Sequence, residues 1–576
     1  MIHSPNTGSS GNSGLSQAIS HRRTTVLFVC ISLGLAACGG GSESTATPIT
    51  VPSPGPTPIA PPPAADQTAP TVPAGLAVTS VGYDRVDLVW QPSSDNVAVK
   101  GYRVLGNGAA LGTSTSTTFG VNGLLPATQY AFTVQAFDEA GNHSATSSTV
   151  MSTTAAAAGR ILAANPGNYA SIVPTLRSGD TLVLEPGAYS DGSMPGLRLR
   201  DLNGTPQAPI TIMGGPTKPR PVLMGRGDVN TVRFGNSSHI VLRHLEIDSL
   251  NLGGDGVRAD GVAHHITLDS LVIKGVGPDQ STVGIATNCG TTWNWIIRRC
   301  VIDGAGTGLY LGNSLGDVPF IAGLIENNLV VNSIGYNMQI KHQLAGLYPS
   351  LPGLPSGPSV TVIRNNVFGK SGNSATGANA RPNLLIGSLP LAGPGANDRY
   401  EIYGNFFYAN PTEALFQGEG NIAFHHNLLV NPSGSGINIQ VHNGEVRAVF
   451  IFANTVVVSS TGIRVSGGAT GFAQKVIGNV VFASSPISAQ DQASNVTDTY
   501  SNAGNYLLNP TGVPGVLDLY PKAGMLQGAA IDRSLFAAFV DYDRDFNGLP
   551  HPNSFRGAYG GSGTNSGWLP RLEIRP

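Results

Sequence analysis

The sequence has little charge and few cysteines. Only 11% of its 576 residues are Asp, Glu, Lys or Arg, and the formal net charge is −2 at pH 7. This balance gives no sign of nucleic-acid binding or of electrostatic attraction to a membrane surface. The 4 cysteines are too few for a disulfide-dependent fold of this length. A chain this long predicts two or three domains.

Glycine and proline are abundant instead. The chain holds 75 Gly and 41 Pro and is rich in Asn, Ser, Thr and Val. This composition favours many short strands joined by turns over helices.

One apolar run lies near the N-terminus, from Val26 to Ala37, and it is too short to be a good membrane-spanning helix. It follows Arg22-Arg23 and ends in Leu35-Ala36-Ala37-Cys38. The pattern resembles the signal peptide of a bacterial lipoprotein, residues 1–38, in which Cys38 is lipidated. The resemblance implies the cell envelope (outer membrane, cell surface or periplasm), with membrane contact only through the lipid anchor. A plain secretory signal is the alternative.

A linker and a small β pattern follow. Residues 39–67 are rich in Pro, Ser and Thr and show no apolar periodicity, which predicts a solvated tether. Residues 68–155 alternate apolar and polar positions, with one tryptophan, Trp90, and with Tyr130 after a turn. They resemble a fibronectin type III domain over its whole length. The resemblance implies a β-sandwich with Trp90 in its core and Tyr130 as its tyrosine corner.

An internal repeat occupies most of the remaining chain. Nine short segments, among them VLRHLEI, LIENNLVV and EIYGNFF, align at steps of about 22 to 39 residues. Six of the nine have asparagine at one shared position, whose residues are His244, Ser270, Cys300, Asn328, Asn366, Asn405, Asn427, Asn454 and Asn479. Short strands at this spacing predict a solenoid of stacked coils. A stacked asparagine amide can hydrogen-bond to the amide of the next coil.

The repeated asparagine resembles the asparagine ladder of right-handed parallel β-helix proteins of the pectate lyase type. The segment GDTLVLEPGAY, residues 179–189, resembles the opening coils of β-helices of the chondroitinase B and alginate lyase type. These resemblances imply an all-β chain in which a right-handed parallel β-helix, residues 158–510, and a closing segment, residues 511–576, follow the sandwich. We expect a monomer.

Each coil continues into a second strand whose alternate side chains point outward. Alignment predicts one outward column of Arg258, Ala286, Tyr310, Gln339, Leu385, Phe416, Asn438 and Arg464. The next outward column is Asp260, Asn288, Gly312, Lys341, Gly387, Gly418, Gln440 and Ser466, flanked by Glu419, His342 and His442. Coils about 4.8 Å apart would join these columns into one long polar face. Such a face is suited to an extended polysaccharide.

The mixture of cations and amides on this face favours β-elimination from a uronate-containing polysaccharide. Lys341 is the predicted base, provided that nearby charge or desolvation lowers its pKa. Tyr310 or His342 would protonate the leaving oxygen. The residues expected to bind the substrate and its carboxylate are Arg258, Asp260, Asn288, Gln339, Gln440, His442 and Arg464.

Other functions stay open. A non-catalytic glycan binder or adhesin would use the same face without a base, and an epimerase would abstract the proton without breaking the chain. A polysaccharide hydrolase needs clustered carboxylates, for which Asp255 and Asp260 are the candidates. No cofactor is predicted with certainty. Calcium is considered because Asp543-x-Asp545-x-Asn547-Gly548 matches half of an EF-hand loop, but the twelfth position is Ser554, which favours a turn.

Two further pairs of residues draw attention. Cys289 and Cys300 are expected to be two buried thiols rather than a disulfide. His425-His426, beside the repeated asparagine, is expected to belong to a turn rather than to a zinc site.

Overall fold

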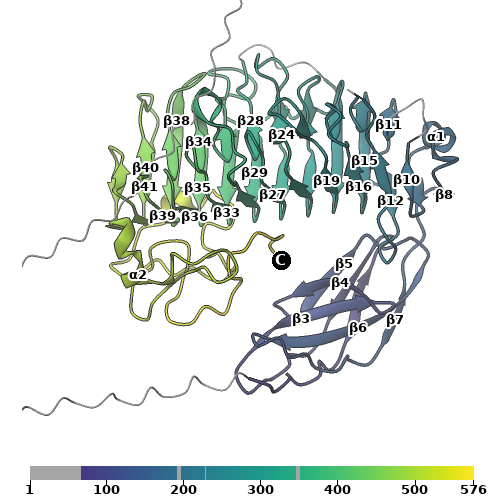
Figure 1. Cartoon of the computed structure of the whole chain (residues 1–576), viewed down its shortest axis with the longest axis horizontal. Coiled ribbons are helices and arrows are strands. Elements are labelled where there is room, and N and C mark those ends of the chain that lie inside the picture. The colour runs from purple at the N-terminus through teal and green to yellow at the C-terminus, as the bar shows by residue number, and fades with distance from the viewer. Residues whose placement is uncertain (1–65, 191–195, 228, 345–350) are drawn as a thin grey trace, which may run out of the picture. The chain divides into compact units, whose positions relative to one another are not determined.

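The computed structural model describes residues 66–190, 196–227, 229–344 and 351–576 (Figure 1). The proposed signal peptide with Cys38 and nearly all of the tether lie outside these residues. The described part is almost entirely strands and turns, which confirms the all-β prediction. Its two α-helices, Tyr169–Ile172 (α1) and Ala503–Tyr506 (α2), have 4 residues each. Among the described residues no helix has the length and apolarity needed to cross a membrane.

A fibronectin type III sandwich comes first along the chain. Its sheets have the strand orders β1-β2-β5 and β4-β3-β6-β7. The strands are β1 (Ala77–Val81), β2 (Arg85–Val89), β3 (Val99–Gly106), β4 (Ala109–Ser114), β5 (Thr118–Asn122), β6 (Gln129–Asp138) and β7 (Val150–Thr153). Trp90 is buried in the core, and the Tyr130 hydroxyl accepts a hydrogen bond from the Leu125 N–H at 2.9 Å. Both structural roles predicted from the sequence are therefore confirmed.

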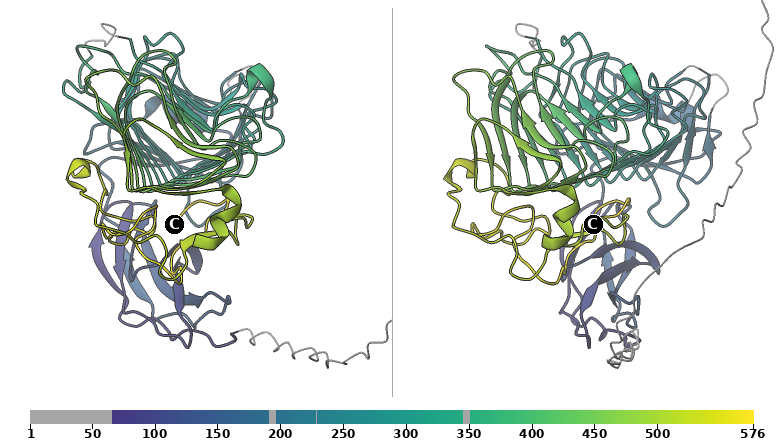
Figure 2. Two further views of the ribbon diagram at one scale, coloured as in Figure 1. Left: turned by 90° about the vertical axis from the view of Figure 1, so that its left-hand side faces the viewer. Right: turned by 60° about the vertical axis from the view of Figure 1, so that its left-hand side comes forward.

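The strands that follow form a right-handed parallel β-helix with three sheets (Figures 1 and 2). The 15-stranded sheet contains β8 (Ile161–Ala164), β9 (Thr181–Leu184), β12 (Ile210–Gly214), β15 (Ser237–Arg243), β18 (Ala263–Asp269), β21 (Thr292–Trp293), β22 (Ile296–Arg298), β25 (Phe320–Ile321), β26 (Leu324–Glu326), β29 (Val360–Arg364), β32 (Arg399–Tyr403), β35 (Gly420–His425), β38 (Val446–Phe452), β41 (Gln474–Ile477) and β44 (Gln492–Ala493).

The other two sheets complete each coil. The 12-stranded sheet contains β10 (Ala188–Tyr189), β13 (Val222–Met224), β16 (Glu246–Asp248), β19 (Val272–Lys274), β23 (Val301–Asp303), β27 (Leu329–Val331), β30 (Val367–Gly369), β33 (Phe406–Tyr408), β36 (Leu428–Asn431), β39 (Thr455–Val458), β42 (Val480–Phe482) and β45 (Val496–Asp498). The 11-stranded sheet contains β11 (Leu197–Arg200), β14 (Val232–Gly235), β17 (Val257–Ala259), β20 (Val283–Ala286), β24 (Thr307–Leu311), β28 (Met338–Ile340), β31 (Leu384–Ile386), β34 (Phe416–Gly418), β37 (Ile437–Ile439), β40 (Thr461–Val465) and β43 (Ser485–Ser488).

Inward-pointing side chains fill the interior of the solenoid as continuous columns. One column of paired positions in the 15-stranded sheet runs through Leu182, Ile212, Leu242, Leu268, Ile297, Ile325, Ile363, Ile402, Phe424, Ile451 and Val476. All of them are fully buried. Burying each such side chain contributes about 1.5–3 kcal/mol, so the stack is held mainly by its apolar interior.

A ladder of asparagines lies at the turn between the 15-stranded and 12-stranded sheets. Each amide Nδ2 donates to the Oδ1 of the next coil's asparagine at 2.9–3.1 Å. The ladder consists of Asn328, Asn366, Asn405, Asn427, Asn454, Asn479 and Asn495. The six predicted asparagines are confirmed, and Asn495 extends the ladder by one coil.

The predicted ladder positions His244 and Ser270 are wrong by one residue. Both have positive φ, 54° and 55°, and occupy the left-handed position that precedes the ladder. The register of the 12-stranded sheet makes Leu245 and Leu271 equivalent to Cys300 and to the first asparagine. Leucine can take this inward position because it packs in the core, whereas polar residues suit the exposed side of the bend.

The cysteine prediction is half correct. Both cysteines are free thiols. Cys300 is buried at the ladder position, where its backbone N–H donates to Asn328 Oδ1 at 2.9 Å. Cys289 is exposed. It follows β20 of the 11-stranded sheet, and its Sγ lies 2.9 Å from a guanidinium nitrogen of Arg258.

The turn interpretation of His425-His426 agrees with the structure. Both histidines are buried, and their Nδ1 atoms lie 2.8 Å apart. The His425 ring is stacked between Tyr403 and Phe452, with centroids 4.9 and 4.6 Å away.

The chain after β45 lies against the outside of the solenoid. It contains α2, β46 (Leu507–Asn509), β47 (Asp518–Pro521) and two 3₁₀ turns, η3 (Tyr500–Asn502) and η4 (Ser534–Phe536). Two further 3₁₀ turns of the described residues, η1 (Val173–Thr175) and η2 (Gly377–Asn379), lie earlier in the chain. Leu519, Tyr559 and Trp568 pack on outer residues of the 12-stranded sheet. Phe536 stacks on Phe452 of the 15-stranded sheet at 3.9 Å. Among the described residues, the buried clusters of this segment include no residue of the 11-stranded sheet.

The half EF-hand segment forms a turn in this closing region. The Asp545 carboxylate accepts backbone N–H groups from Asn547, Leu549 and Gly560 at 2.9–3.1 Å. These bonds hold the segment in the turn that the sequence favours.

The ladder predicts a position-dependent cost of replacement. Asn427→Leu removes the acceptor for both the N–H and the Nδ2 of Asn405, and we expect it to lower the free energy of unfolding by about 2–4 kcal/mol. Asn328→Leu at the ladder's end removes the acceptor of one N–H, that of Cys300, and should cost about half as much. Urea unfolding followed by circular dichroism measures both changes. Equal costs at the two positions would contradict a cooperative ladder.

Candidate functional site

The outer side of the 11-stranded sheet carries the residues singled out in the sequence. Its register aligns one outward column of Arg198, Arg233, Arg258, Ala286, Tyr310, Gln339, Leu385, Gln417, Asn438, Arg464 and Ser488. Lys341 directly follows β28 and lies beside this column. We refer to this outer surface as the polar face.

Two expected members of the polar face are wrong by one residue. Phe416 pairs with Leu384 and Ile437, is fully buried, and lies 4.6 Å from the Phe424 ring. Gln417 therefore takes its place outside. The same shift puts Glu419, rather than Gly418, in the second column. The apolar Phe416 fits the core better than Gln417 does, and a shift of one residue reverses every side chain of a strand.

Glu419 holds a loop in place. Its side chain is buried, and its carboxylate accepts backbone N–H groups from Ser388, His442, Asn443 and Gly444 at 2.8–3.2 Å. The exposed side chain of His442 is thereby positioned at the edge of the polar face.

The first coils of the face neutralise their own charge. Arg258 pairs with Asp255 at 2.6 Å and with Asp260 at 3.5 Å, and Asp260 also binds Arg233. Burial raises the pKa of Asp255, against the opposing effect of Arg258. Asp255 also accepts the Val283 N–H at 2.8 Å. These groups bind each other, which disfavours both a hydrolytic acid pair and a carboxylate clamp at Arg258.

The central coils differ because their cations have no acidic partner at contact distance. Lys341 is half-buried, and its Nζ lies 5.2 Å from the centroid of the Tyr310 ring. Within the described ranges, no ion pair or hydrogen-bond acceptor is found for this Nζ. Burial lowers the pKa of Lys341, and the positive charge of Arg381 lowers it further. The amine is therefore shifted towards its neutral, basic form.

Arg381 is the cation that the sequence alignment missed. It lies just before β31, with its guanidinium 5.8 Å from the Tyr336 ring. Its backbone carbonyl accepts a 2.7 Å hydrogen bond from Nζ of Lys370, whose pKa burial lowers to about 7. A signal existed in the sequence: Lys370 and Arg381 are the only charged residues between 370 and 383.

Within the described ranges, two side chains of the column have an unpaired oxygen: Gln339, two residues before Lys341, and Asn438, three coils farther along. Gln339 is only 4% exposed, and its Oε1 is buried without a hydrogen-bond donor in the described part. The Asn438 Oδ1 is in the same state, while its Nδ2 donates to Gln440 at 3.0 Å. The Tyr310 hydroxyl is hydrogen-bonded to Ser314 Oγ. Buried acceptors of this kind normally have a donor, and sugar hydroxyls would supply one.

His342 lies next to Lys341 at the end of β28. Burial lowers its pKa, the neighbouring Lys341 and His442 act in the same direction, and Glu419 opposes them. Its imidazole is thus biased towards the neutral form near pH 7.

Other expected binding residues lie farther along the polar face. Arg258 is three coils and Arg464 four coils from Gln339 in the column, or roughly 14 and 19 Å at about 4.8 Å per coil. Asn288 follows β20, one coil from Arg258, and its Oδ1 lies 3.9 Å from Cys289 Sγ. Arg258 and Arg464 therefore lie too far along the column to contact the same sugar unit as Lys341, whereas Arg381 is near enough for its charge to lower the pKa of Lys341.

Two groups of side chains in the described part have the spacing to hold a metal ion. One is Asp66, Asp95 and Asp138 in the sandwich, and the other is His239, His264 and His265 in the β-helix. Neither group includes a residue of the polar face.

Comparison with known proteins identifies the first domain. Residues 69–153 match the fibronectin type III domain family, so the chain contains such a domain. Chitinase Chi52 of Paenibacillus xylanexedens is 47% identical over 92 residues, 16% of this chain and 18% of that protein. A gellan lyase of a Bacillus species is 39% identical over 74 residues, 13% of this chain and 3% of that protein. The chain spans less than a fifth of the length of these relatives.

One solved structure aligns along most of the chain. The Family 28 exopolygalacturonase of Yersinia enterocolitica covers 65% of this chain and 100% of its own, with 13% identity and a TM-score of 0.29.

The proximity of Arg381 predicts a measurable pKa change at Lys341. Arg381→Gln removes the nearby positive charge, so the pKa of Lys341 should rise towards its ordinary value. An NMR titration of the lysine side-chain signals measures this change, with Lys341→Met assigning the resonance. Arg464→Gln, four coils away, serves as the matched control and should leave the pKa unchanged. An unaltered Lys341 titration in Arg381→Gln would contradict the interaction.

Proposed function

We propose that the polar face binds an anionic, uronate-containing polysaccharide and cleaves it by β-elimination at Lys341. The observation that carries this proposal is a half-buried lysine without an acidic partner in the described part, with a pKa lowered by burial and by Arg381. The likeness of the sandwich to segments of proteins named as chitinase and gellan lyase supports a polysaccharide as the class of substrate.

In the proposed reaction, Arg381 neutralises the substrate carboxylate, which makes the proton on the adjacent carbon more acidic. The neutral Nζ of Lys341 takes that proton. The electron pair left behind forms a carbon–carbon double bond, and the bond from the neighbouring carbon to the glycosidic oxygen breaks. The leaving oxygen receives a proton from the Tyr310 hydroxyl, or from His342 when its imidazole is protonated, a form that its lowered pKa disfavours near pH 7. The products are one new sugar end and one unsaturated uronate end.

The remaining face residues would bind the flanking sugars. Gln339 and Asn438 carry unpaired buried acceptors that suit sugar hydroxyls, and Gln440 and His442 lie on the same side. Arg464, exposed at the far end of the column, would contact a more distant carboxylate. Asn288, Arg258 and Asp260 would contact the opposite end of the bound chain.

The base assignment predicts a large loss of activity in Lys341→Ala. Removing a general base costs about 10²–10⁴-fold in rate, and the outward position of Lys341 predicts little change in thermal stability. Ultraviolet absorbance of the unsaturated product, from the full chain incubated with a panel of uronate polymers, measures the activity. Lys475→Ala, in the 15-stranded sheet, is the control.

Three other outcomes would reject this reaction. Full activity in Lys341→Ala would exclude it as the base. New reducing ends without unsaturated product would indicate a hydrolase. Binding without any cleavage would leave a surface glycan binder or an epimerase, which use the same face.

We also propose that the protein is exported and lipid-anchored through Cys38. The support is the lipoprotein-like signal ending at that residue. Cys38→Ser should abolish labelling of the expressed protein by a fatty-acid analogue. Cys30→Ser, inside the apolar run of the same signal, should retain labelling, and loss in both variants or in neither would contradict the assignment.

A further inference from the structure

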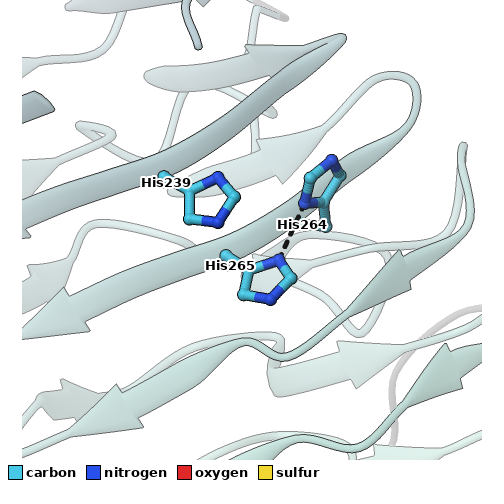
Figure 3. Close-up of side chains that lie close together, drawn as sticks. All are labelled: His239, His264 and His265. Atoms are coloured by element: carbon cyan, nitrogen blue, oxygen red, sulfur yellow. Dashed lines mark hydrogen bonds between the residues drawn. The ribbon is translucent and has the colours of Figure 1, made fainter. Parts of the chain in front are cut away.

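Three histidines lie together on two neighbouring coils, outside the polar face (Figure 3). His239 belongs to β15, and His264 and His265 belong to β18. Ser238 pairs with His264 and Ile240 with Ile266, so His239 and His265 occupy equivalent bends of the two strands. Both residues have a φ of 53°, in the left-handed region.

The stacking of the two bends fixes the three rings. The His239 and His265 rings lie parallel, with centroids 4.4 Å apart and an interplanar angle of 14°. The His264 ring stands across the His265 ring at 79° and stacks on Trp293 at 4.2 Å. Each imidazole therefore has an orientation set by its neighbours before any ligand arrives.

The ring nitrogens lie close together, and one of them has no hydrogen-bond partner in the described part of the chain. One nitrogen of each histidine lies within 4.8 Å of the others. The Nδ1 atoms of His264 and His265 are 2.8 Å apart, so one of the two must donate to the other's lone pair. The Nδ1 of His239 is buried and has no hydrogen-bond partner in the described part of the chain. The cluster thus contains a buried polar atom that its protein neighbours leave unsatisfied.

The surroundings of the cluster disfavour positive charge on its rings. Burial, together with His265 and His239, lowers the pKa of His264 to about 4. Burial also lowers the pKa of His239 and of His265.

The bend itself does not explain the histidines. In the following coils the equivalent bend positions are Asn294 and Ala322, with φ of 55° and 53°. The backbone conformation therefore needs no imidazole. His264, moreover, is not at the bend, yet its Nδ1 lies 2.8 Å from Nδ1 of His265.

Asn294 provides a second shell. Its side-chain amide lies 2.9 Å from Nε2 of His265. The nearest amide atom is Nδ2, which donates to Nε2, so the proton of neutral His265 lies on Nδ1 and points to Nδ1 of His264. A metal ion bound to Nδ1 would displace this proton, and a half-turn of the Asn294 amide would then place its oxygen against Nε2–H. Metal-binding histidines are commonly oriented in this way by a partner on the other ring nitrogen.

We propose that His239, His264 and His265 bind one divalent transition-metal ion, with Zn²⁺ as the reference ion, through a ring nitrogen of each. Imidazole nitrogens suit zinc, copper and nickel, and three such ligands leave a fourth position for water. Because the ligands come from two coils, the ion links β15 to β18. The site is independent of the proposed lyase reaction.

Equilibrium dialysis of the full chain without a histidine tag, followed by metal analysis, tests the proposal. We expect about one Zn²⁺ per chain. His265→Asn and His239→Asn place at each bend the residue type of Asn294, which occupies the equivalent left-handed bend one coil after His265, so they should fold normally and lower zinc affinity at least 100-fold. His143→Asn, an exposed histidine of the sandwich, is the matched control and should bind as the parent does.

Two further readouts separate binding from folding. Bound Co²⁺ should give visible absorption bands characteristic of its coordination. These bands should disappear in His264→Ser, which introduces the residue type of Ser238, the paired position in β15. Asn294→Ala should retain one ion with about 10-fold weaker affinity. Zinc binding far below one ion per chain in the parent, or equal binding in the parent and His265→Asn, would overturn the proposal.

Discussion

The hydrogen bonds between stacked asparagine amides are the constraint on which the arrangement of the β-helix depends. Each ladder asparagine receives the backbone N–H and the amide of the preceding coil and passes its own amide to the next. These bonds are fully buried, so losing a partner would leave polar groups without water. Each coil from Asn328 to Asn495 must therefore return to the same point, and the strands of the other two sheets in these coils share that register.

The polar face follows from this register. Once the turn is fixed, the alternation of each strand decides which side chains leave the core, and the outward residues of the 11-stranded sheet form one column. Loops then place further polar and charged side chains beside this column. The Glu419 carboxylate accepts three backbone N–H groups from the loop of His442 and a fourth from Ser388, and Lys370 donates to the carbonyl of Arg381. The closing segment covers parts of the other two sheets. Among the described residues, its buried clusters include no residue of the 11-stranded sheet, which carries the polar face.

Sequence reasoning succeeds where one position repeats and fails where loop length varies. The ladder asparagines were readable because their role demands one residue type, and Lys341 was placed because its strand alternates clearly. Phe416 and His244 were misplaced by one residue, since short strands leave the register to packing rather than to pattern. Arg381 was missed because it enters from an insertion and belongs to no repeat. The histidine cluster needs two coils in register, which no single segment of sequence reveals.

Charge distribution along the polar face is the reason for placing the proposed reaction at its centre. At one end, Arg258 and Arg233 lie against Asp255 and Asp260, so those coils require no outside ion. In the centre, partial burial raises the energy of the charged form of Lys341, and the nearby positive charge of Arg381 adds to it. An anionic polymer bound there would supply negative charge beside Lys341 and Arg381, which have no acidic partner at contact distance in the described residues. Its carboxylate would be attracted to Arg381, while the neutral amine of Lys341 would remain free to accept a proton.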